Sequence, residues 1–333
     1  MASNKLARLV SRPVGMVKHD DFEIVEEPVR EPGPGEFRVK VSHASIDPAM
    51  RGWLRDQRSY VPPVGIGEVM RAGAVGIVEA SNNDAFKPGD MAVGQFGIQQ
   101  YAISDGRGCY TVDPSKAPPE RWIGGLGMPG MTAYFGLLEI GQPKEGETVV
   151  VSAASGAVGS IVGQLAKLRG ARAVGIAGGP EKCAYVVDEL GFDACVDYKA
   201  GNLYKDLRAA CPNGIDVNFE NVGGDIMNTI LAQMNPFGRM PLCGLISQYN
   251  NTDLAPGPAN FGSILVNRLN VRGFIVFDFA RKYPEAARDL GQWHAEGKLK
   301  MREDVREGGV DAFVDTLNLL YSGGNFGKLV LKI

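Results

Sequence analysis

Histidine and cysteine, the residues that most often bind transition metals, are scarce in this sequence. There are three histidines and five cysteines among 333 residues, and the cysteines at positions 109, 183, 195, 211 and 243 form no C-x-x-C pair. An odd cysteine count without paired spacing argues against both a disulfide framework and a zinc ribbon. We therefore expect a protein of the reducing cytoplasm.

Long apolar runs and an excess of positive charge are also absent. No run approaches the roughly 18 apolar residues that a membrane helix needs, and the start, MASNKLARLVSRPVG, has no apolar segment like that of a signal peptide. The net charge of -3 leaves no basic excess for phosphate backbones or anionic lipid. We expect neither a membrane nor a nucleic acid as a partner.

The chain has two regions with different patterns, as its length leads us to expect. Residues 20–115 consist of short β-type segments, such as FRVKV at 37–41, separated by turn clusters such as EPGPGE and FKPGD. From about Gly146, strands alternate with helices, which predicts a parallel sheet with crossover helices. The strand-like residues 327–332 should return to the first domain. The predicted domains are therefore 1–124, 125–298 and a returning segment, 299–333.

A glycine-rich turn joins the first strand of the α/β region to its first helix. In VVVSAASGAVGSIVGQL at 149–165, Ala153, Gly156 and Gly159 give the spacing A-x-x-G-x-x-G. Unpaired amides and the helix dipole at such a turn favour an anion, which glycine allows to approach. Despite Ala at the first position, the pattern predicts a dinucleotide-binding turn, with Gly163 on the face of the helix that packs on the sheet. The alternative is a purely structural turn.

The end of the second strand indicates which nicotinamide cofactor binds. Sites for NAD carry Asp or Glu there, which accepts a hydrogen bond from the ribose 2′-hydroxyl. This chain has Gly178 and Gly179 instead, followed by Glu181 and Lys182. A missing acid and a nearby cation predict NADPH. Glu181 either points away or partly neutralises Lys182, and the alternative for Lys182 is a solvated residue at a helix start.

The β region offers no set of residues that could hold a catalytic zinc. Dehydrogenases of similar layout hold zinc with Cys and His, whereas this region contains only Cys109, His19 and His43. We predict no metal site. The sequence therefore favours hydride transfer to an acceptor that is already electrophilic over oxidation of a metal-bound alkoxide.

Motifs along nearly the whole chain resemble one family. They are DPAMRGWL, SYVPPVGIGEVMRAGAVG, GMPGMTAYFGLL, SAASGAVGS, FENVGG, LCGLISQYNN, LAPGPANF, RGFIVFDF and GGNFGKLVLKI. Together they are similar to the zinc-independent medium-chain dehydrogenase/reductases, in the group of prostaglandin reductase, plant alkenal double-bond reductase and bacterial curcumin reductase. The resemblance implies an α/β fold, with a GroES-like β domain and a doubly wound Rossmann domain that binds NADP(H).

The resemblance also implies which residues bind the cofactor. By motif, the pyrophosphate would face Gly156, Ala157, Val158 and Gly159; the adenosine ribose and its 2′-phosphate would face Gly178, Lys182 and Tyr198; and the nicotinamide half would face Asn221, Cys243, Tyr249, the strand Phe274, Ile275 and Val276, Asn325 and Thr132.

The implied reaction is hydride transfer from NADPH to the β-carbon of a small apolar enone or enal, which leaves an enolate that needs a hydrogen-bond donor. Tyr249 is the first candidate, because it would bind the ribose hydroxyl and so organise the donor. Tyr60 is the second, as an acid on the substrate side, and the α-carbon proton comes from Tyr60 or from water. Either tyrosine could instead be a packing aromatic.

Two other functions remain open at this point, a quinone oxidoreductase and an NADPH-binding sensor without turnover. The LAPGPANF and SQYNN segments favour the enone reductase over the quinone enzyme. The apolar segment at 269–277 reads as a buried or edge strand. In the family the corresponding strand pairs across a two-fold axis, so the resemblance implies a homodimer.

Overall fold

The chain folds as two units, which are described separately: Met1–Gly124 with Glu303–Ile333, and Gly125–Arg302. The structure is a computed structural model that describes residues 3–333. Met1 and Ala2, which begin the segment predicted to contain no signal peptide, lie outside the described residues. The second boundary differs from the predicted one at 298/299. It lies later because strand β14 (Glu303–Arg306) pairs with β15 (Lys328–Lys332) in the first unit.

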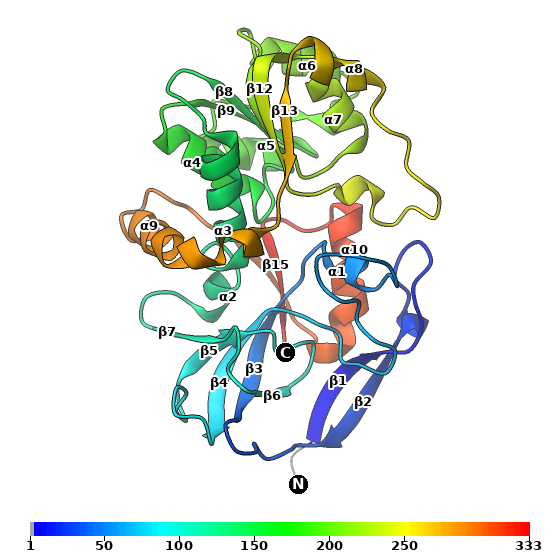
Figure 1. Cartoon of the computed structure of the whole chain (residues 1–333), viewed down its shortest axis with the longest axis vertical. Helices are drawn as coiled ribbons and strands as arrows, with labels where there is room; N and C mark the ends of the chain where they lie inside the picture. Colours follow the sequence, from blue (N-terminus) through cyan, green and yellow to red (C-terminus); the bar gives the residue numbers. More distant parts are fainter. Residues whose placement is uncertain (1–2) are drawn as a thin grey trace. The chain divides into compact units, whose positions relative to one another are not determined.

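The first unit, called unit 1, is built on a seven-stranded sheet with the order β14-β15-β3-β4-β5-β7, in which β6 pairs with β3 (Figure 1). The C-terminal strand β15 pairs antiparallel with β3, so the last residues lie within the sheet that the N-terminal region forms. The other strands of this sheet are β3 (Phe37–Ser45), β4 (Ala74–Ser81), β5 (Met91–Gly94), β6 (Tyr101–Ser104) and β7 (Tyr110–Val112). A separate two-stranded antiparallel sheet is formed by β1 (Ser3–Leu9) and β2 (Phe22–Pro28).

Short helices flank this sheet. They are η1 (His19–Asp21), α1 (Met50–Trp53), α2 (Pro119–Trp122), η8 (Gly309–Ala312) and α10 (Phe313–Ser322). Phe37, at the centre of the core, is fully buried and stacks on Phe86 with ring centroids 4.1 Å apart. The alternation of apolar and polar residues along β3 places one face of the strand on this core.

The second unit, called unit 2, contains a six-stranded sheet with the order β10-β9-β8-β11-β12-β13. Every neighbouring pair is parallel. This is the doubly wound order, in which the chain runs outward from β8 in one direction and from β11 in the other. The strands are β8 (Thr148–Ser152), β9 (Arg172–Ala177), β10 (Ala194–Asp197), β11 (Ile215–Phe219), β12 (Met234–Leu242) and β13 (Asn270–Gly273).

Helices connect these strands and cover the sheet (Figure 1). All residues of β8 are buried, as its continuous β-branched run predicts for a central parallel strand. Helix α4 packs on β8 and β9, whereas α6 packs with α7. The helices are α3 (Met128–Phe135), η2 (Gly136–Gly141), α4 (Gly159–Leu168), α5 (Pro180–Ala184), η3 (Tyr185–Glu189), η4 (Tyr198–Ala200), α6 (Leu203–Ala210), α7 (Gly224–Leu231), η5 (Ile246–Gln248), η6 (Ala259–Phe261), α8 (Gly262–Val266), η7 (Val276–Lys282) and α9 (Tyr283–Ala295).

The prediction of a strand at Phe274–Val276 is wrong. Strand β13 ends at Gly273, where its register with Leu242 at the end of β12 also ends. With no partner strand beyond that point, the chain turns away and enters η7 at Val276. Among residues 3–333, no helix combines the length and the apolar character that crossing a bilayer requires.

Candidate active site

The predicted cofactor residues of unit 2 follow the carboxyl ends of four adjacent strands. Gly156 follows β8, Gly178 follows β9, Asn221 follows β11 and Cys243 follows β12. The ends of neighbouring parallel strands lie at one edge of a sheet, and the chain reverses its direction of travel between β8 and β11. Ligands of doubly wound sheets bind outside this switch point.

The turn between β8 and α4 is shaped by the carbonyl of Ala153. Ala153 adopts a φ of 52°, a left-handed conformation that favours glycine. A Cβ on Gly159 would lie 2.3 Å from the Ala153 oxygen, so only glycine fits there. The first hydrogen bond into α4 runs from the Ser160 amide to the Gly156 carbonyl at 3.1 Å. The amides of residues 157–159 precede that bond and are therefore available to an anion.

A compact polar cluster follows β9 and β10. A Cβ on Gly178 would lie 2.9 Å from the Tyr198 hydroxyl and 3.0 Å from the Lys199 side chain, so these residues are adjacent. The Asp197 carboxylate accepts hydrogen bonds from the amides of Gly179 at 2.8 Å and Lys199 at 2.9 Å. Lys182 lies nearby in the chain, in the first turn of α5.

Lys199 is a candidate that the sequence reasoning missed. Its ammonium lies 6.0 Å from the centroid of the Tyr198 ring. The available signal was its position directly after Tyr198, which the resemblance had already assigned to the 2′-phosphate region. Two lysines rather than one therefore follow the ends of β9 and β10, and the Asp197 carboxylate, which holds the amides of Gly179 and Lys199, is the acid among them.

The end of β11 holds a buried carboxylate, Glu220, that sequence reasoning did not single out. Its side chain is fully buried. Oε1 accepts hydrogen bonds from the amides of Val222 at 2.7 Å and Gly223 at 2.8 Å and from the Ser152 hydroxyl at 3.0 Å, and Oε2 accepts from the Asn218 amide at 2.8 Å. Burial raises the pKa of Glu220 above its ordinary value, although these donors favour the ionised form.

Asn221 connects β11 to the neighbouring strand ends. Its backbone amide donates to the Ser152 hydroxyl and its side-chain amide donates to the Ser152 carbonyl, both at 2.8 Å. Its carbonyl accepts from the amide of Ile246, in the segment that follows β12. Asn221 and Glu220 therefore fix the position of the loop after β11 relative to β8 and to the loop after β12.

Cys243 and Tyr249 lie in the segment that follows β12. Burial, with a smaller contribution from the negative charge of Glu220, raises the pKa of the Cys243 thiol to about 12. The thiol is therefore neutral near pH 7 and is no nucleophile. The Tyr249 hydroxyl accepts a hydrogen bond from the Leu245 amide at 3.1 Å, and a Cβ on Gly244 would lie 3.0 Å from it. The phenol is thus held over its own loop.

Four further predicted residues lie in the helices of unit 2 or directly before one of them. The Thr132 hydroxyl donates to the Met128 carbonyl at 2.8 Å, within α3. The Phe274 ring is buried and packs edge-on against Phe219, with centroids 6.2 Å apart. Ile275 follows as a half-buried residue, and Val276 is buried at the start of η7.

Tyr60 and Asn325 belong to unit 1. Tyr60 is 48% exposed, and its hydroxyl accepts a hydrogen bond from the Trp53 indole at 3.3 Å. The Asn325 side-chain amide donates to the Gly327 carbonyl at 3.0 Å, just before β15.

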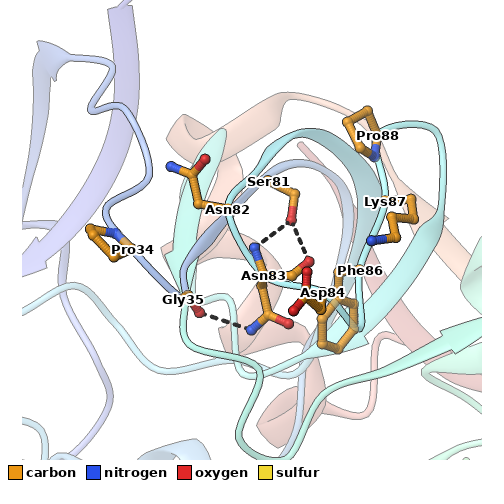
Figure 2. Close-up of a pocket in the computed structure, with 9 residues that line it drawn as sticks. All are labelled: Pro34, Gly35, Ser81, Asn82, Asn83, Asp84, Phe86, Lys87 and Pro88. Carbon is orange, nitrogen blue, oxygen red and sulfur yellow. Dashed lines mark hydrogen bonds between the residues drawn. The ribbon is translucent and has the colours of Figure 1, made fainter.

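A separate hollow of about 500 Å³ lies in unit 1 and contains none of the predicted residues (Figure 2). It is lined by loop residues around Asn82 and Asn83. The Asn82 side chain donates to the Pro32 carbonyl at 2.6 Å and the Asn83 side chain to the Gly35 carbonyl at 2.8 Å. These amides hold the loop together. Within residues 3–333, no three His, Cys, Asp or Glu side chains are grouped so that they could hold a metal ion.

Comparison with known proteins identifies the family. Residues 5–112 match the family described as N-terminal domain of oxidoreductase, and residues 157–292 match the zinc-binding dehydrogenase family. The chain is 44% identical over 330 residues to NADPH-dependent curcumin reductase of Escherichia coli, covering 98% of this chain and 95% of the relative. It is 39% identical over 323 residues to prostaglandin reductase 1 of Rattus norvegicus, covering 96% and 95%.

A solved structure is similar over the same extent. CurA from Vibrio vulnificus in complex with NADPH superposes with a TM-score of 0.93 at 46% identity, covering 98% of each chain. Length, identity and fold therefore agree across both units of the chain. The chain belongs to the medium-chain dehydrogenase/reductase family, in the group of oxidoreductases that includes the curcumin, prostaglandin and 2-alkenal reductases.

Proposed function

We propose that this protein uses NADPH to reduce the carbon–carbon double bond of α,β-unsaturated aldehydes and ketones. The observation that carries the proposal is the pairing, in one sheet, of a glycine turn after β8 with a glycine and lysine cluster after β9. The turn suits a pyrophosphate, and the cluster suits a 2′-phosphate. The names of the relatives, which are reductases of curcumin and prostaglandins, support the enone as acceptor.

Different residues would bind the cofactor and stabilise the reacting oxygen. The amides of Ala157, Val158 and Gly159 would hold the pyrophosphate at the start of α4. Lys182 and Lys199 would pair with the 2′-phosphate. Bound NADPH supplies a hydride from its nicotinamide ring. Tyr249, whose oxygen accepts from the Leu245 amide, can donate its own hydrogen to the ribose or to the enolate oxygen. Tyr60 remains the second candidate donor.

The first test follows NADPH absorbance with purified protein and a panel of enals, enones and quinones, with NADH in parallel. We expect consumption of NADPH with enones and a product that is the saturated carbonyl compound. Turnover of quinones alone would favour the quinone oxidoreductase instead. Tight NADPH binding without any turnover would favour a sensor.

Removing the two lysines should change cofactor choice. In Lys182→Ala with Lys199→Ala, we expect the KM for NADPH to rise tenfold or more, because each hydrogen bond to a charged group contributes about 1.5–3 kcal/mol. The KM for NADH should change little, since NADH has no 2′-phosphate. The matched control is Lys205→Ala, which removes an exposed cation on α6. An equal rise for both cofactors would contradict the assignment.

Tyr249→Phe should lower kcat by roughly a hundredfold to a thousandfold, as expected for loss of a donor to a developing oxyanion. The dissociation constant for NADPH, measured by fluorescence titration, should change by less than kcat does. Tyr204→Phe, at an exposed tyrosine on α6, is the control. If Tyr60→Phe lowers kcat more than Tyr249→Phe, the donor is Tyr60.

We also propose that the protein is a cytoplasmic homodimer. Strand β13 is an edge of the unit 2 sheet, and Asn270, Arg272 and Gly273 in it are exposed. Next to it in the chain, α8 exposes Leu265 and Val266, at 81% and 67%. An exposed edge beside apolar side chains suits pairing with a second copy. Sedimentation should give a dimer, and a monomer at micromolar concentration would contradict this.

The cytoplasmic location is supported by the cysteines, which are all free thiols and therefore fit a reducing compartment.

A further inference from the structure

Two cysteines that are 12 residues apart in the sequence have adjacent side chains in unit 2. The Sγ atoms of Cys183, in α5, and Cys195, in β10, lie 2.9 Å apart. Both residues are half-buried and neither is in a disulfide. Because a disulfide bond is about 2.0 Å long, the sulfurs need to approach by only about 0.9 Å to be joined.

The surroundings of the pair leave room for that approach. Cys195 lies opposite Gly175 of β9 in the parallel register, and a Cβ on Gly175 would be 3.4 Å from the Cys195 sulfur. Ala177, the last residue of β9, pairs in the same register with Asp197, two residues after Cys195. The pair therefore lies close to Gly178 and Gly179, the glycine segment that follows β9.

We propose that Cys183 and Cys195 are a modification site at which a hydroperoxide forms a reversible intramolecular disulfide. In the first step the Cys183 thiolate attacks the peroxide oxygen, the O–O bond breaks, an alcohol or water leaves, and Cys183 becomes a sulfenic acid. In the second step the Cys195 sulfur attacks the sulfenic sulfur, the S–S bond forms and water leaves. The two sulfurs lose two electrons in total, which the peroxide gains, and both thiol hydrogens end in the released water and alcohol.

Burial keeps both thiols protonated at rest. It raises the pKa of both, so the resting state near pH 7 is the dithiol and only a small thiolate fraction reacts. We assign that thiolate to Cys183, because Cys183 lies on the short helix α5, whereas Cys195 lies within the sheet opposite Gly175. The first step is slow. The second step joins two adjacent sulfurs within one molecule, so it is faster than further oxidation of the Cys183 sulfenic acid.

The disulfide would act on the neighbouring polar cluster. Cys183 directly follows Lys182, and Cys195 lies two residues before Asp197, whose carboxylate holds the amides of Gly179 and Lys199. A covalent link between α5 and β10 would restrict both sides of that cluster. We expect oxidation to weaken NADPH binding severalfold. This consequence rests on the proposed function, whereas the disulfide itself does not.

The disulfide is tested on the full-length protein with hydrogen peroxide as the probe. After free thiols are alkylated, peptide mass spectrometry should find the Cys183 and Cys195 peptides joined, lighter by two hydrogens than their sum, and separated again by dithiothreitol. Cys195→Ser should instead accumulate sulfenic or sulfinic acid at Cys183. Cys109→Ser, at a half-buried cysteine of unit 1, should form the link normally. Sulfinic acid at Cys183 in the wild type, with Cys195 still a thiol, would overturn the proposal.

The coupling is tested by fluorescence titration with NADPH before oxidation, after it, and after reduction. We expect a severalfold weaker affinity that dithiothreitol restores and that Cys195→Ser does not show. A complete link with unchanged affinity would overturn the coupling. If the untreated protein binds no NADPH, the proposed function fails, and the mass spectrum still decides whether the disulfide forms.

Discussion

Glu220→Ala should destabilise the protein by about 3 kcal/mol or more, because each buried donor left without a partner costs about 1–3 kcal/mol. The groups that lose their acceptor are the amides of Val222 and Gly223, the Ser152 hydroxyl and the Asn218 side chain. Denaturant unfolding measures the loss. NADPH affinity should fall as well, since the same carboxylate fixes the loop after β11. A variant with wild-type stability would show that Glu220 does not hold this loop.

Glu220→Gln is the matched variant, because it keeps the shape and removes only the charge. Its oxygen can still accept from Val222 and Gly223, and Asn218 can turn its own amide to accept from the new NH₂ group. We therefore expect a smaller loss than in Glu220→Ala, with NADPH affinity partly retained. An equal loss in both variants would mean that the negative charge, not the acceptor geometry, is required.

The pH dependence of stability separates these variants further. An acid whose pKa is raised in the folded state binds more protons there than in the unfolded chain. The free energy of unfolding therefore falls as the pH rises from the ordinary value of 4.5 to the folded pKa of Glu220. Denaturant unfolding at a series of pH values should show this slope in the wild type and a shallower one in Glu220→Gln. The same slope in both would contradict the raised pKa.

Gly163→Val should destabilise unit 2 by about 3 kcal/mol, at the upper end of typical overpacking costs. A Cβ on Gly163 would lie 1.8 Å from the Phe192 ring. That ring is buried, and Phe192 lies in the segment of the chain that connects η3 to β10. The ring would have to move, and with it the segment that leads into β10. Thermal or denaturant unfolding measures the change.

Two variants make this prediction specific. Gly291→Val, in α9, adds the same side chain where nothing outside its own helix backbone and chain neighbours lies within 4 Å of the new Cβ, and it should be nearly neutral. Phe192→Ala removes the obstructing ring, so Gly163→Val should cost much less in that background than alone. Additive losses in the double variant would show that the ring is not the cause.

Patterns within one segment predicted most of unit 2. The strand, glycine turn and helix at 149–165, the acid-free strand end at 177–179 and the alternation that follows all depend on residues close in sequence, and the sheet order and the β8–α4 turn agree with them. What could not be predicted depends on distant partners. The expectation that Gly163 faces the sheet stays a prediction, and the ring nearest to it, Phe192, belongs to a different connection along the chain.

The same limit explains the other differences. The length of a strand depends on its neighbour. The apolar pattern at Phe274–Val276 predicts a strand, but the pairing partner β12 ends at Leu242, opposite Gly273. The partners of Glu220 come from two different strands, so FENVGG alone did not mark its acid as a buried acceptor. Cys183 and Cys195 carry no spacing signal, because a helix and a turn separate them before the sheet brings their sulfurs together.

The position of β15 sets an order of events during synthesis. β15 pairs with β14 on one side and β3 on the other, so the sheet of unit 1 lacks an interior strand until residues 328–332 have left the ribosome. Unit 2, by contrast, is continuous in sequence and has all its strands once Gly273 has emerged. Domains usually fold as they are made, from the N-terminus onward. Here the inserted unit can finish first, while the earlier-made strands of unit 1 wait with β3 only partly paired and exposed to chaperones.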